Sequence, residues 1–118
     1  MRYNVPMEHV MKLQGDPFAK IKAGTKDIEM RLYDEKRRKI SVGDVVVFCH
    51  TETGEKITCS VKAMHRYPDF SMLYAAFDKR RIGYNEWETA DPKDMEAYYP
   101  IEEIARYGVV GIEVEIEK

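Results

Sequence analysis

Residues 28–33 read IEMRLY, and apolar side chains alternate along them with Glu29, Arg31 and Tyr33. This period of two predicts a β-strand, because successive side chains of a strand point to opposite faces. We expect the three apolar residues to face the core and the other three to face away from it. Glu29 and Arg31 then lie about 6.7 Å apart on one face of the strand.

A short helix is predicted immediately before this strand, between Asp16 and Gly24. Asp16 suits the capping position of a helix N-terminus, and Pro17 suits the first helical position because its φ is already helical. Gly24 suits the left-handed residue that follows the last turn. The chain can therefore reverse at Gly24 and bring Lys26 to the start of the strand.

The rest of the chain predicts more strands than long helices. Apolar runs predict four further strands, at residues 9–13, 45–49, 57–63 and 109–117. Short helices are predicted at 71–77, 91–99 and 100–106, with a charged loop at 34–39. Because long helices do not alternate with the strands, we expect an α+β domain over residues 1–118, built as an antiparallel barrel or half-barrel with small helices inserted.

Composition excludes several classes of protein. The chain has 118 residues, 44% of them hydrophobic, which suits a single domain with one core. No apolar run approaches the ~18 residues of a membrane span, and the N-terminal residues lack a signal-peptide pattern. With only two cysteines, a disulfide scaffold is excluded as well. We therefore expect a cytoplasmic protein that does not enter membranes.

Charge is balanced in total but unevenly distributed. The chain carries 19 basic and 21 acidic side chains. Residues 20–39 hold eight basic and four acidic side chains, whereas residues 83–118 hold three basic and ten acidic ones. This asymmetry could build one positive face on an acidic protein, or it could serve solubility alone.

Motifs for metals, cofactors and nucleophiles are missing from the sequence. The histidines and cysteines lack the spacing of a zinc site, and we expect Cys49 and Cys59 to form a buried pair of free thiols. The sequence contains no phosphate-binding glycine loop, dinucleotide fingerprint or G-x-S-x-G motif. We therefore expect neither a metal nor an organic cofactor.

The strongest candidate for a site lies at the start of the strand. If its polar face lines a groove, Lys26, Glu29 and Arg31 bring an ammonium, a carboxylate and a guanidinium together. Tyr33 continues the row. A carboxylate between two cations is favoured in its ionised form, and it could orient Arg31, accept a hydrogen bond or act as a base. Spacing alone favours a simpler reading, a solvated row of ion pairs outside the barrel that contributes little.

Two further features suggest contact with nucleic acid. Four adjacent cations could bind RNA phosphates without sequence preference. They are Lys36, Arg37, Arg38 and Lys39. Most such runs are simply solvated. Nine of the 13 aromatic residues lie within residues 67–107, interleaved with basic side chains, as on single-strand stacking surfaces. Core packing explains most of them, and we expect Trp87 to pack. Tyr67 and Tyr84 lie in loop-like contexts and are candidates for stacking on bases.

The pattern Gly24-x-Lys26-x-x-Glu29-x-Arg31 resembles the signature of the ASCH domain family, small domains related to the PUA fold of RNA-binding proteins. All four fixed positions match, in the same context between a helix and a strand. Pro17-Phe18 at the helix start and residues 42–48 and 107–112 also resemble the family, so the likeness covers most of the chain.

This resemblance implies a PUA-like, mostly antiparallel β-barrel of about five to six strands, with short helices flanking a cleft. It implies that Lys26, Glu29 and Arg31 line that cleft and that the ligand is single-stranded RNA or a modified nucleoside. Gly24 and Tyr33 complete the ligand-binding set that we expect.

One branch of the family looks like an enzymatic precedent: bacterial amidohydrolases that remove the acetyl group from N4-acetylcytidine. They use a lysine base, a threonine nucleophile three residues later and a glutamate acid. Lys26 matches the lysine, but Glu29 stands where the threonine is required, and Glu86 and Glu88 are both candidates for the acid. Without the hydroxyl, Lys26 and Glu29 would have to activate water by a different mechanism.

Three hypotheses follow for the function. A noncatalytic protein that binds RNA or a nucleoside ranks above a hydrolase, either an amidohydrolase on a modified cytidine or a ribonuclease. A protein-interaction module ranks third, with the aromatic segment or Glu113, Glu115 and Glu117 as its contact surface. The sequence does not indicate which protein such a module would bind.

Overall fold

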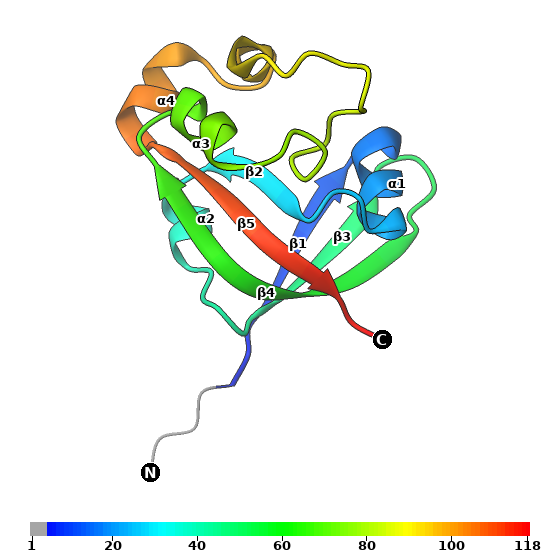
Figure 1. Ribbon diagram of the computed structural model, residues 1–118. Helices are drawn as coiled ribbons and strands as arrows, with labels where there is room; N and C mark the ends of the chain where they lie inside the picture. Colours follow the sequence, from blue (N-terminus) through cyan, green and yellow to red (C-terminus); the bar gives the residue numbers. More distant parts are fainter. Residues whose placement is uncertain (1–4) are drawn as a thin grey trace.

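A five-stranded sheet curls around a hydrophobic core in the computed structural model, which describes residues 5–118 (Figure 1). The elements are β1 (Glu8–Leu13), α1 (Gly15–Ala23), β2 (Ile28–Leu32), α2 (Glu35–Arg38), β3 (Val45–His50), β4 (Lys56–Tyr67), α3 (Phe70–Ala76), the 3-10 helix η1 (Pro92–Ala97), α4 (Ile101–Tyr107) and β5 (Val109–Ile116). The α+β half-barrel with short helices that the sequence predicts is confirmed.

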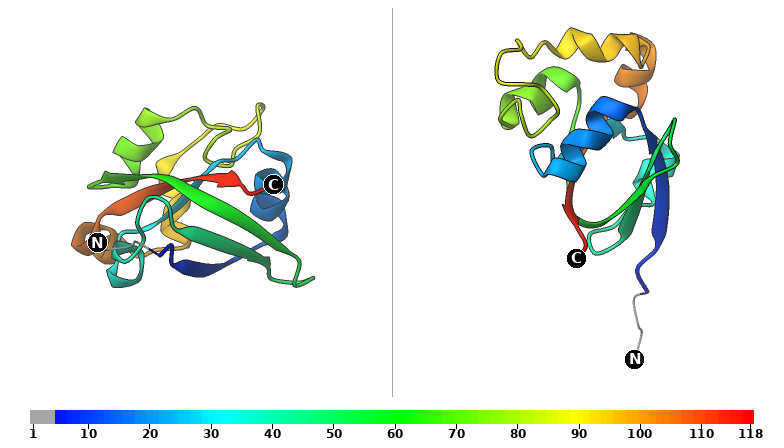
Figure 2. Two further views of the ribbon diagram at one scale, coloured as in Figure 1. Left: turned by 90° about the horizontal axis from the view of Figure 1, so that it is seen from below. Right: turned by 90° about the vertical axis from the view of Figure 1, so that its right-hand side faces the viewer.

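The strands lie in the order β1-β3-β4-β5-β2, so β1 and β2 are the two edges. All neighbouring pairs are antiparallel except β1 and β3, which run parallel. The pairing of β4 with β5 shifts register between Val61 and Ala63. A shift of this kind bends a strand and increases its twist, which lets the long β4 follow the curl of the sheet. Figure 2 shows the result, an incomplete barrel with the helices of residues 70–107 on one side.

Two hydrophobic clusters cover opposite faces of β2 and β5. The inner cluster fills the curl of the sheet and includes Phe18 of α1 and Ile112 of β5. The outer cluster lies between these strands and the cap, the name used here for residues 70–107, and includes Ile28 and Leu73. Because both faces of β2 are covered, the expectation of a solvated ion-pair row was wrong: Glu29 is buried.

Gly111 of β5 leaves room for the side chain of Ile28 on the neighbouring strand β2. A Cβ atom at this position would lie 2.9 Å from Cγ2 of Ile28 and 3.6 Å from Cδ1 of Leu73. Real Cβ atoms do not approach other carbons as closely as the first distance, so the Ile28 side chain of β2 would have to shift to admit a larger residue, whereas Leu73 of α3 would be in ordinary contact.

Two local predictions about helices were wrong. Helix α1 follows a Gln14 cap, and Asp16 lies in its first turn, where it pairs with Nζ of Lys20 at 2.8 Å. The expected charged loop contains the short helix α2, because the side chain of Asp34 accepts the backbone N–H of Arg37 at 3.1 Å and caps it.

Trp87 and the cysteines also differ from expectation. Trp87 is 83% exposed and does not pack; its loop is held by Lys79 Nζ, which donates to the carbonyl oxygens of Glu86 (2.7 Å) and Glu88 (2.6 Å). The hairpin register places Cys59 opposite Val46 and Cys49 opposite Lys56, so the two thiols are not cross-strand neighbours.

No helix within residues 5–118 is long and apolar enough to cross a membrane. Among the same residues, no group of three or more histidine, cysteine or acidic side chains is arranged to hold a metal ion.

Candidate ligand-binding site

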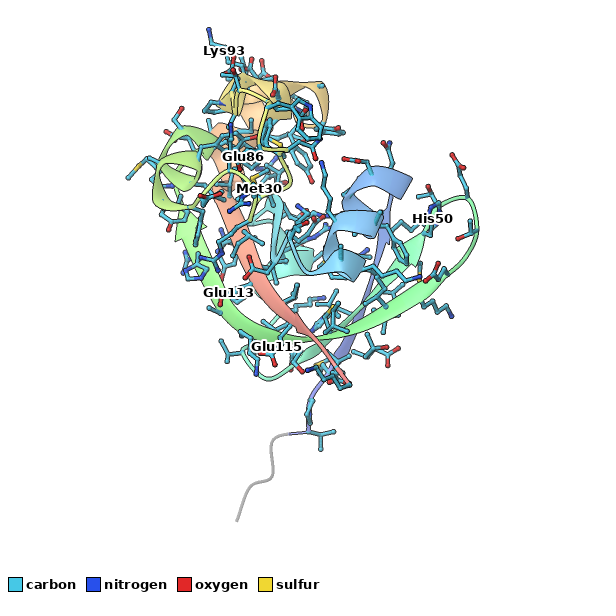
Figure 3. The ribbon with its side chains drawn as sticks, turned by 45° about the vertical axis from the view of Figure 1, so that its right-hand side comes forward. Met30, His50, Glu86, Lys93, Glu113 and Glu115 are labelled. Atoms are coloured by element: carbon cyan, nitrogen blue, oxygen red, sulfur yellow. The ribbon has the colours of Figure 1, made fainter. Side chains whose placement is uncertain are left out.

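An open cavity of about 980 Å³ lies between the sheet and the cap. One side comes from α1, β2 and the end of β1, and the other from α3, η1 and the loop between them. Figure 3 places Met30 of β2 beneath the cap, with Glu86 and Lys93 above it. The cavity is thus formed by segments from both halves of the chain.

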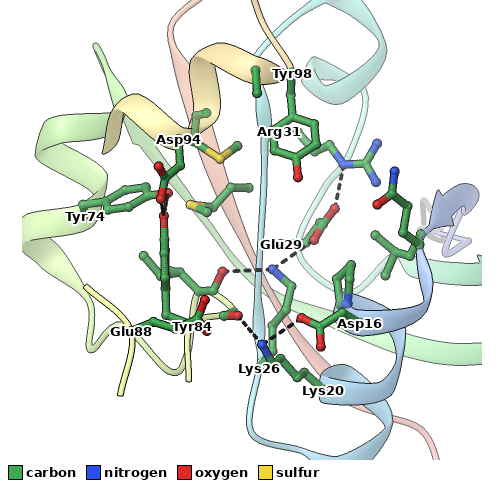
Figure 4. Close-up of a pocket in the computed structure, with 18 of the residues that line it drawn as sticks. Asp16, Lys20, Lys26, Glu29, Arg31, Tyr74, Tyr84, Glu88, Asp94 and Tyr98 are labelled. Carbon is green, nitrogen blue, oxygen red and sulfur yellow. Dashed lines mark hydrogen bonds and ion pairs between the residues drawn. The ribbon is translucent and has the colours of Figure 1, made fainter. Parts of the chain in front are cut away.

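Glu29 lies at the base of this cavity between two cations (Figure 4). Its Oε1 is 3.2 Å from Nζ of Lys26, and its Oε2 accepts a hydrogen bond from Nε of Arg31 at 2.7 Å. The side chains of Glu29 and Lys26 are only 7% and 5% exposed. Arg31 also donates from Nη2 to the carbonyl oxygen of Lys12 at 3.1 Å, which ties β2 to the facing edge strand β1.

The glycine turn after α1 positions Lys26. Gly24 adopts a left-handed conformation with φ of 85°, which glycine takes without steric cost. The backbone N–H groups of Thr25 and Lys26 then donate to the carbonyl oxygen of Lys20 at 3.1 and 3.2 Å. This tight reversal turns the Lys26 side chain inward beside Glu29.

Electrostatics keep the Glu29 carboxylate ionised. Burial by itself raises its pKa, but the charges and hydrogen bonds of Lys26 and Arg31 outweigh burial and hold that pKa below its ordinary value of 4.5. A carboxylate with a lowered pKa is a weak base, so Glu29 is suited to accepting hydrogen bonds rather than abstracting protons.

The Lys26 ammonium uses its donors within the protein. It is within hydrogen-bonding distance of the carbonyl oxygens of Ile28 (2.9 Å) and Ile82 (3.2 Å) in addition to the Glu29 carboxylate. An ammonium group has three donors and no lone pair. In this arrangement Lys26 serves as a fixed cation rather than as a base.

The opposite wall carries a chain of hydroxyl and carboxylate groups. The Tyr84 hydroxyl donates to Oδ2 of Asp94 at 2.7 Å and lies 2.8 Å from the Tyr74 hydroxyl. Burial and these two hydrogen bonds raise the pKa of the Tyr84 hydroxyl, so it stays protonated at neutral pH. This chain joins α3, the loop and η1 into one wall. Successive members lie ten residues apart in sequence, and no local pattern marks Tyr74 or Asp94.

Lys20 closes the cavity at its α1 end. Its Nζ pairs with Asp16 and donates to the carbonyl oxygen of Gly83 in the cap loop, both at 2.8 Å. Sequence reasoning counted Lys20 only as part of the basic segment. The spacing of Asp16 and Lys20, four residues apart on a helix, was a usable signal for the pair but not for the bond to Gly83.

The structure brings together three of the five residues expected to bind a ligand. Lys26, Glu29 and Arg31 all line the cavity, whereas Gly24 and Tyr33 do not. Gly24 shapes the turn that places Lys26, and Tyr33 lies beyond the end of β2.

The four adjacent cations at residues 36–39 lie outside the main cavity. Lys36 and Arg37 of α2 instead line a smaller cavity of about 280 Å³ beside β1. Arg37 is partly engaged, since its Nη1 lies 3.4 Å from Oδ2 of Asp34. Arg38 and Lys39 are exposed on the same segment. Phosphate binding by these four residues stays a prediction.

The two stacking candidates lie in different places. Tyr84 lines the cavity, whereas Tyr67 packs against the outer hydrophobic cluster with its ring 6.3 Å from that of Phe77. Of the two candidates for a catalytic acid, Glu88 lines the cavity and Glu86 does not.

Two solved structures are similar to this chain over nearly all its length. The hypothetical protein PH0355 is 33% identical, with a TM-score of 0.80 over 94% of this chain and 100% of that one. Protein PF0455 from Pyrococcus furiosus is 34% identical, with a TM-score of 0.74 over 95% of this chain and 99% of that one.

A more distant match supports the fold alone. A mutant of ZmASCH from Zymomonas mobilis is 15% identical, with a TM-score of 0.66 over 94% of this chain and 70% of that one. Among curated proteins, none matches the sequence significantly. The ASCH domain itself matches residues 11–117, which include the glycine turn and the Lys26–Glu29–Arg31 cluster and leave out only the first ten residues and the last one. The chain therefore belongs to the ASCH domain family.

Proposed function

We propose that this protein binds a nucleoside, either free or as one base of a single-stranded RNA, in the cavity above Glu29. The observation that carries the proposal is the buried, ionised Glu29 carboxylate held beside the Arg31 guanidinium. Together they offer an acceptor and a donor next to each other at the base of an open cavity.

A nucleobase edge complements this pair. Each carboxylate oxygen of Glu29 accepts one hydrogen bond within the protein and retains capacity for another. In Arg31, Nε and Nη2 are engaged, and no hydrogen bond from Nη1 occurs within residues 5–118. Carboxylates accept from exocyclic amino groups of bases, and guanidinium groups donate to ring nitrogens and carbonyl oxygens. Both partners are preorganised, so binding would not require the site to rearrange.

The walls suit a flat, polar ligand. Tyr84, Tyr98 and Tyr99 line the cavity, and Tyr98 is 66% exposed. Aromatic rings at such a site stack on bases without regard to sequence. A volume of about 980 Å³ is ample for a nucleoside.

A hydrolase is less well supported by the same geometry. Lys26 has its donors engaged and Glu29 is a weak base, so neither is poised to activate water. The threonine of the related amidohydrolases is also replaced by Glu29. Binding without catalysis therefore accounts better for the engaged donors of Lys26, the low basicity of Glu29 and the missing threonine.

Titration with labelled single-stranded RNA and calorimetry with single ribonucleosides test the proposal. The nucleoside panel should contain the four ribonucleosides and N4-acetylcytidine. We expect Arg31→Gln and Tyr98→Ala to weaken binding, each by about tenfold, from the loss of a charged hydrogen bond or a stacking interaction.

Trp87→Ala is the matched control for Tyr98→Ala. Trp87 is an exposed aromatic residue that does not line the cavity, so its replacement should leave affinity unchanged. Absence of binding to the RNA and to every nucleoside, even at low salt, would refute the proposal. Binding that Arg31→Gln and Tyr98→Ala leave intact would place the ligand elsewhere.

A further inference from the structure

Two arginines from distant parts of the chain meet on the ring of Tyr33. The guanidinium carbon of Arg38 in α2 lies 4.7 Å from the centre of this ring, and that of Arg66 in β4 lies 4.3 Å from it. Arg38 also donates from Nε to the Tyr33 carbonyl oxygen at 3.1 Å. The two guanidinium carbons are therefore separated by at most the sum of their two distances to the ring centre.

Neither of these arginines is neutralised. Within residues 5–118, no carboxylate lies within ion-pair distance of Arg38 or Arg66, although Arg37 beside them pairs with Asp34. Both residues are exposed. Contact with an aromatic ring uses the face of a guanidinium and leaves the N–H donors at its edge available. The Tyr33 ring thus orients two cations and leaves most of their donors free.

This arginine pair lies near the nucleoside cavity. Arg31 and Arg66 both pair with Val110 of β5, one from each side, so the three side chains lie on one face of the sheet. At the usual strand spacing the backbones of the two arginines are about 10 Å apart. Arg66 therefore lies on the same face of the sheet as Arg31, which lines the cavity.

We propose that Arg38 and Arg66, oriented by Tyr33, bind a backbone phosphate of the same RNA strand whose base occupies the cavity. This inference rests on the proposed function and adds the interaction that distinguishes a strand from a free nucleoside. Guanidinium groups match phosphate oxygens with two parallel hydrogen bonds. Lys36 and Lys39, exposed on the same segment, add positive charge around this phosphate.

Fluorescence anisotropy with a labelled single-stranded RNA decamer tests the proposal over a salt series from about 50 to about 200 mM. We expect Arg38→Ala and Arg66→Ala each to weaken binding about tenfold at low salt. The slope of log K against log salt should fall by about 0.7 for each phosphate that the variant no longer neutralises.

Arg80→Ala is the matched control. Arg80 is an exposed arginine in the cap loop, and its Nε lies 3.3 Å from Oε2 of Glu86. Its replacement removes the same charge, so an equal loss of affinity in this variant would mean unspecific attraction and would overturn the proposal. Arg38→Lys and Arg66→Lys keep the charge without the planar fork and should retain only part of the affinity. They carry the test if thermal unfolding shows that an alanine variant does not fold.

Nucleosides and nucleotides separate this inference from the proposed function. A ribonucleoside without phosphate should bind the Arg38→Ala and Arg66→Ala variants as tightly as the wild type. If a nucleoside monophosphate loses as much affinity in these variants as the decamer does, the arginine pair binds the phosphate of a free nucleotide. That outcome would overturn the RNA interaction.

RNA binding with unchanged affinity and salt slope in both variants would overturn this inference while the proposed function stands. Failure of the wild type to bind RNA or any nucleoside would overturn both.

Discussion

Replacement of Glu29 by glutamine tests whether the buried carboxylate balances its two cations. Glutamine keeps the shape of the side chain but removes its charge, which leaves Lys26, only 5% exposed, without a counter-ion. Breaking a buried ion pair from one side costs about 3–5 kcal/mol. Lys26 keeps two carbonyl acceptors and Arg31 is 16% exposed, so we expect the lower end, about 3 kcal/mol.

Urea denaturation at neutral pH measures this loss, and the melting temperature should fall on the order of 10 °C. Glu55→Gln is the control, because its pair with Lys22 is about half exposed and should contribute less than about 1 kcal/mol. The double variant Lys26→Met/Glu29→Gln should lose less stability than the two single variants combined, since it removes the buried Lys26 cation that Glu29→Gln alone leaves without a counter-ion. A loss in Glu29→Gln no larger than in the control would refute the reasoning.

Acid titration gives an independent check on the same residue. The folded-state pKa of Glu29 lies below 4.5, so its contribution is fully present above pH 4.5 and is lost as pH falls through the folded value. The stability difference between wild type and Glu29→Gln should therefore shrink as pH falls below 4.5. A difference that stays constant down to low pH would show that the carboxylate charge is not what stabilises the site.

Three further experiments test the packing and hydrogen bonding of the fold. Gly111→Ala should cost about 1–3 kcal/mol in urea denaturation, because the added methyl group overlaps its neighbours; an unchanged midpoint would contradict the close packing. Burial raises the pKa of the Cys59 thiol to about 11, so at pH 8 a thiol reagent should label the partly exposed Cys49 first and reach Cys59 only on unfolding. Asp44 is buried and accepts backbone N–H bonds from Met7 and Ser41 at 3.1 and 3.0 Å, so Asp44→Asn should lose about 1–3 kcal/mol by chemical denaturation. Asparagine keeps one acceptor oxygen and replaces the other with a donor, so stability equal to the wild type would show that water replaces the lost acceptor.

Local sequence patterns were sufficient for the strands and for the motif. Alternation within residues 28–33 identified β2, and Gly24 was correctly placed at the left-handed end of α1. These features depend on backbone conformation and on spacing over a few residues, which the sequence displays directly. The resemblance to ASCH domains then linked Lys26, Glu29 and Arg31 to one cleft.

The burial of Glu29 could not be predicted in the same way. Its strand alternates like any half-exposed strand, but Glu29 lies on the face of Ile112 and the inner cluster, while Ile28 lies on the face that the cap covers. The Ile82 carbonyl that binds Lys26 lies 56 residues away in sequence. No sequence pattern near residue 29 predicts this contact with Ile82.

The sequence by itself thus determined the strands, the end of α1 at Gly24 and the set of charged residues that meet at β2. Tertiary structure alone decided that these charges lie at the base of a cavity, that Trp87 stays in solvent and that Arg38 and Arg66 share one ring. The physical reason is that conformation follows from neighbouring residues, whereas burial and electrostatic environment follow from segments that only folding brings together.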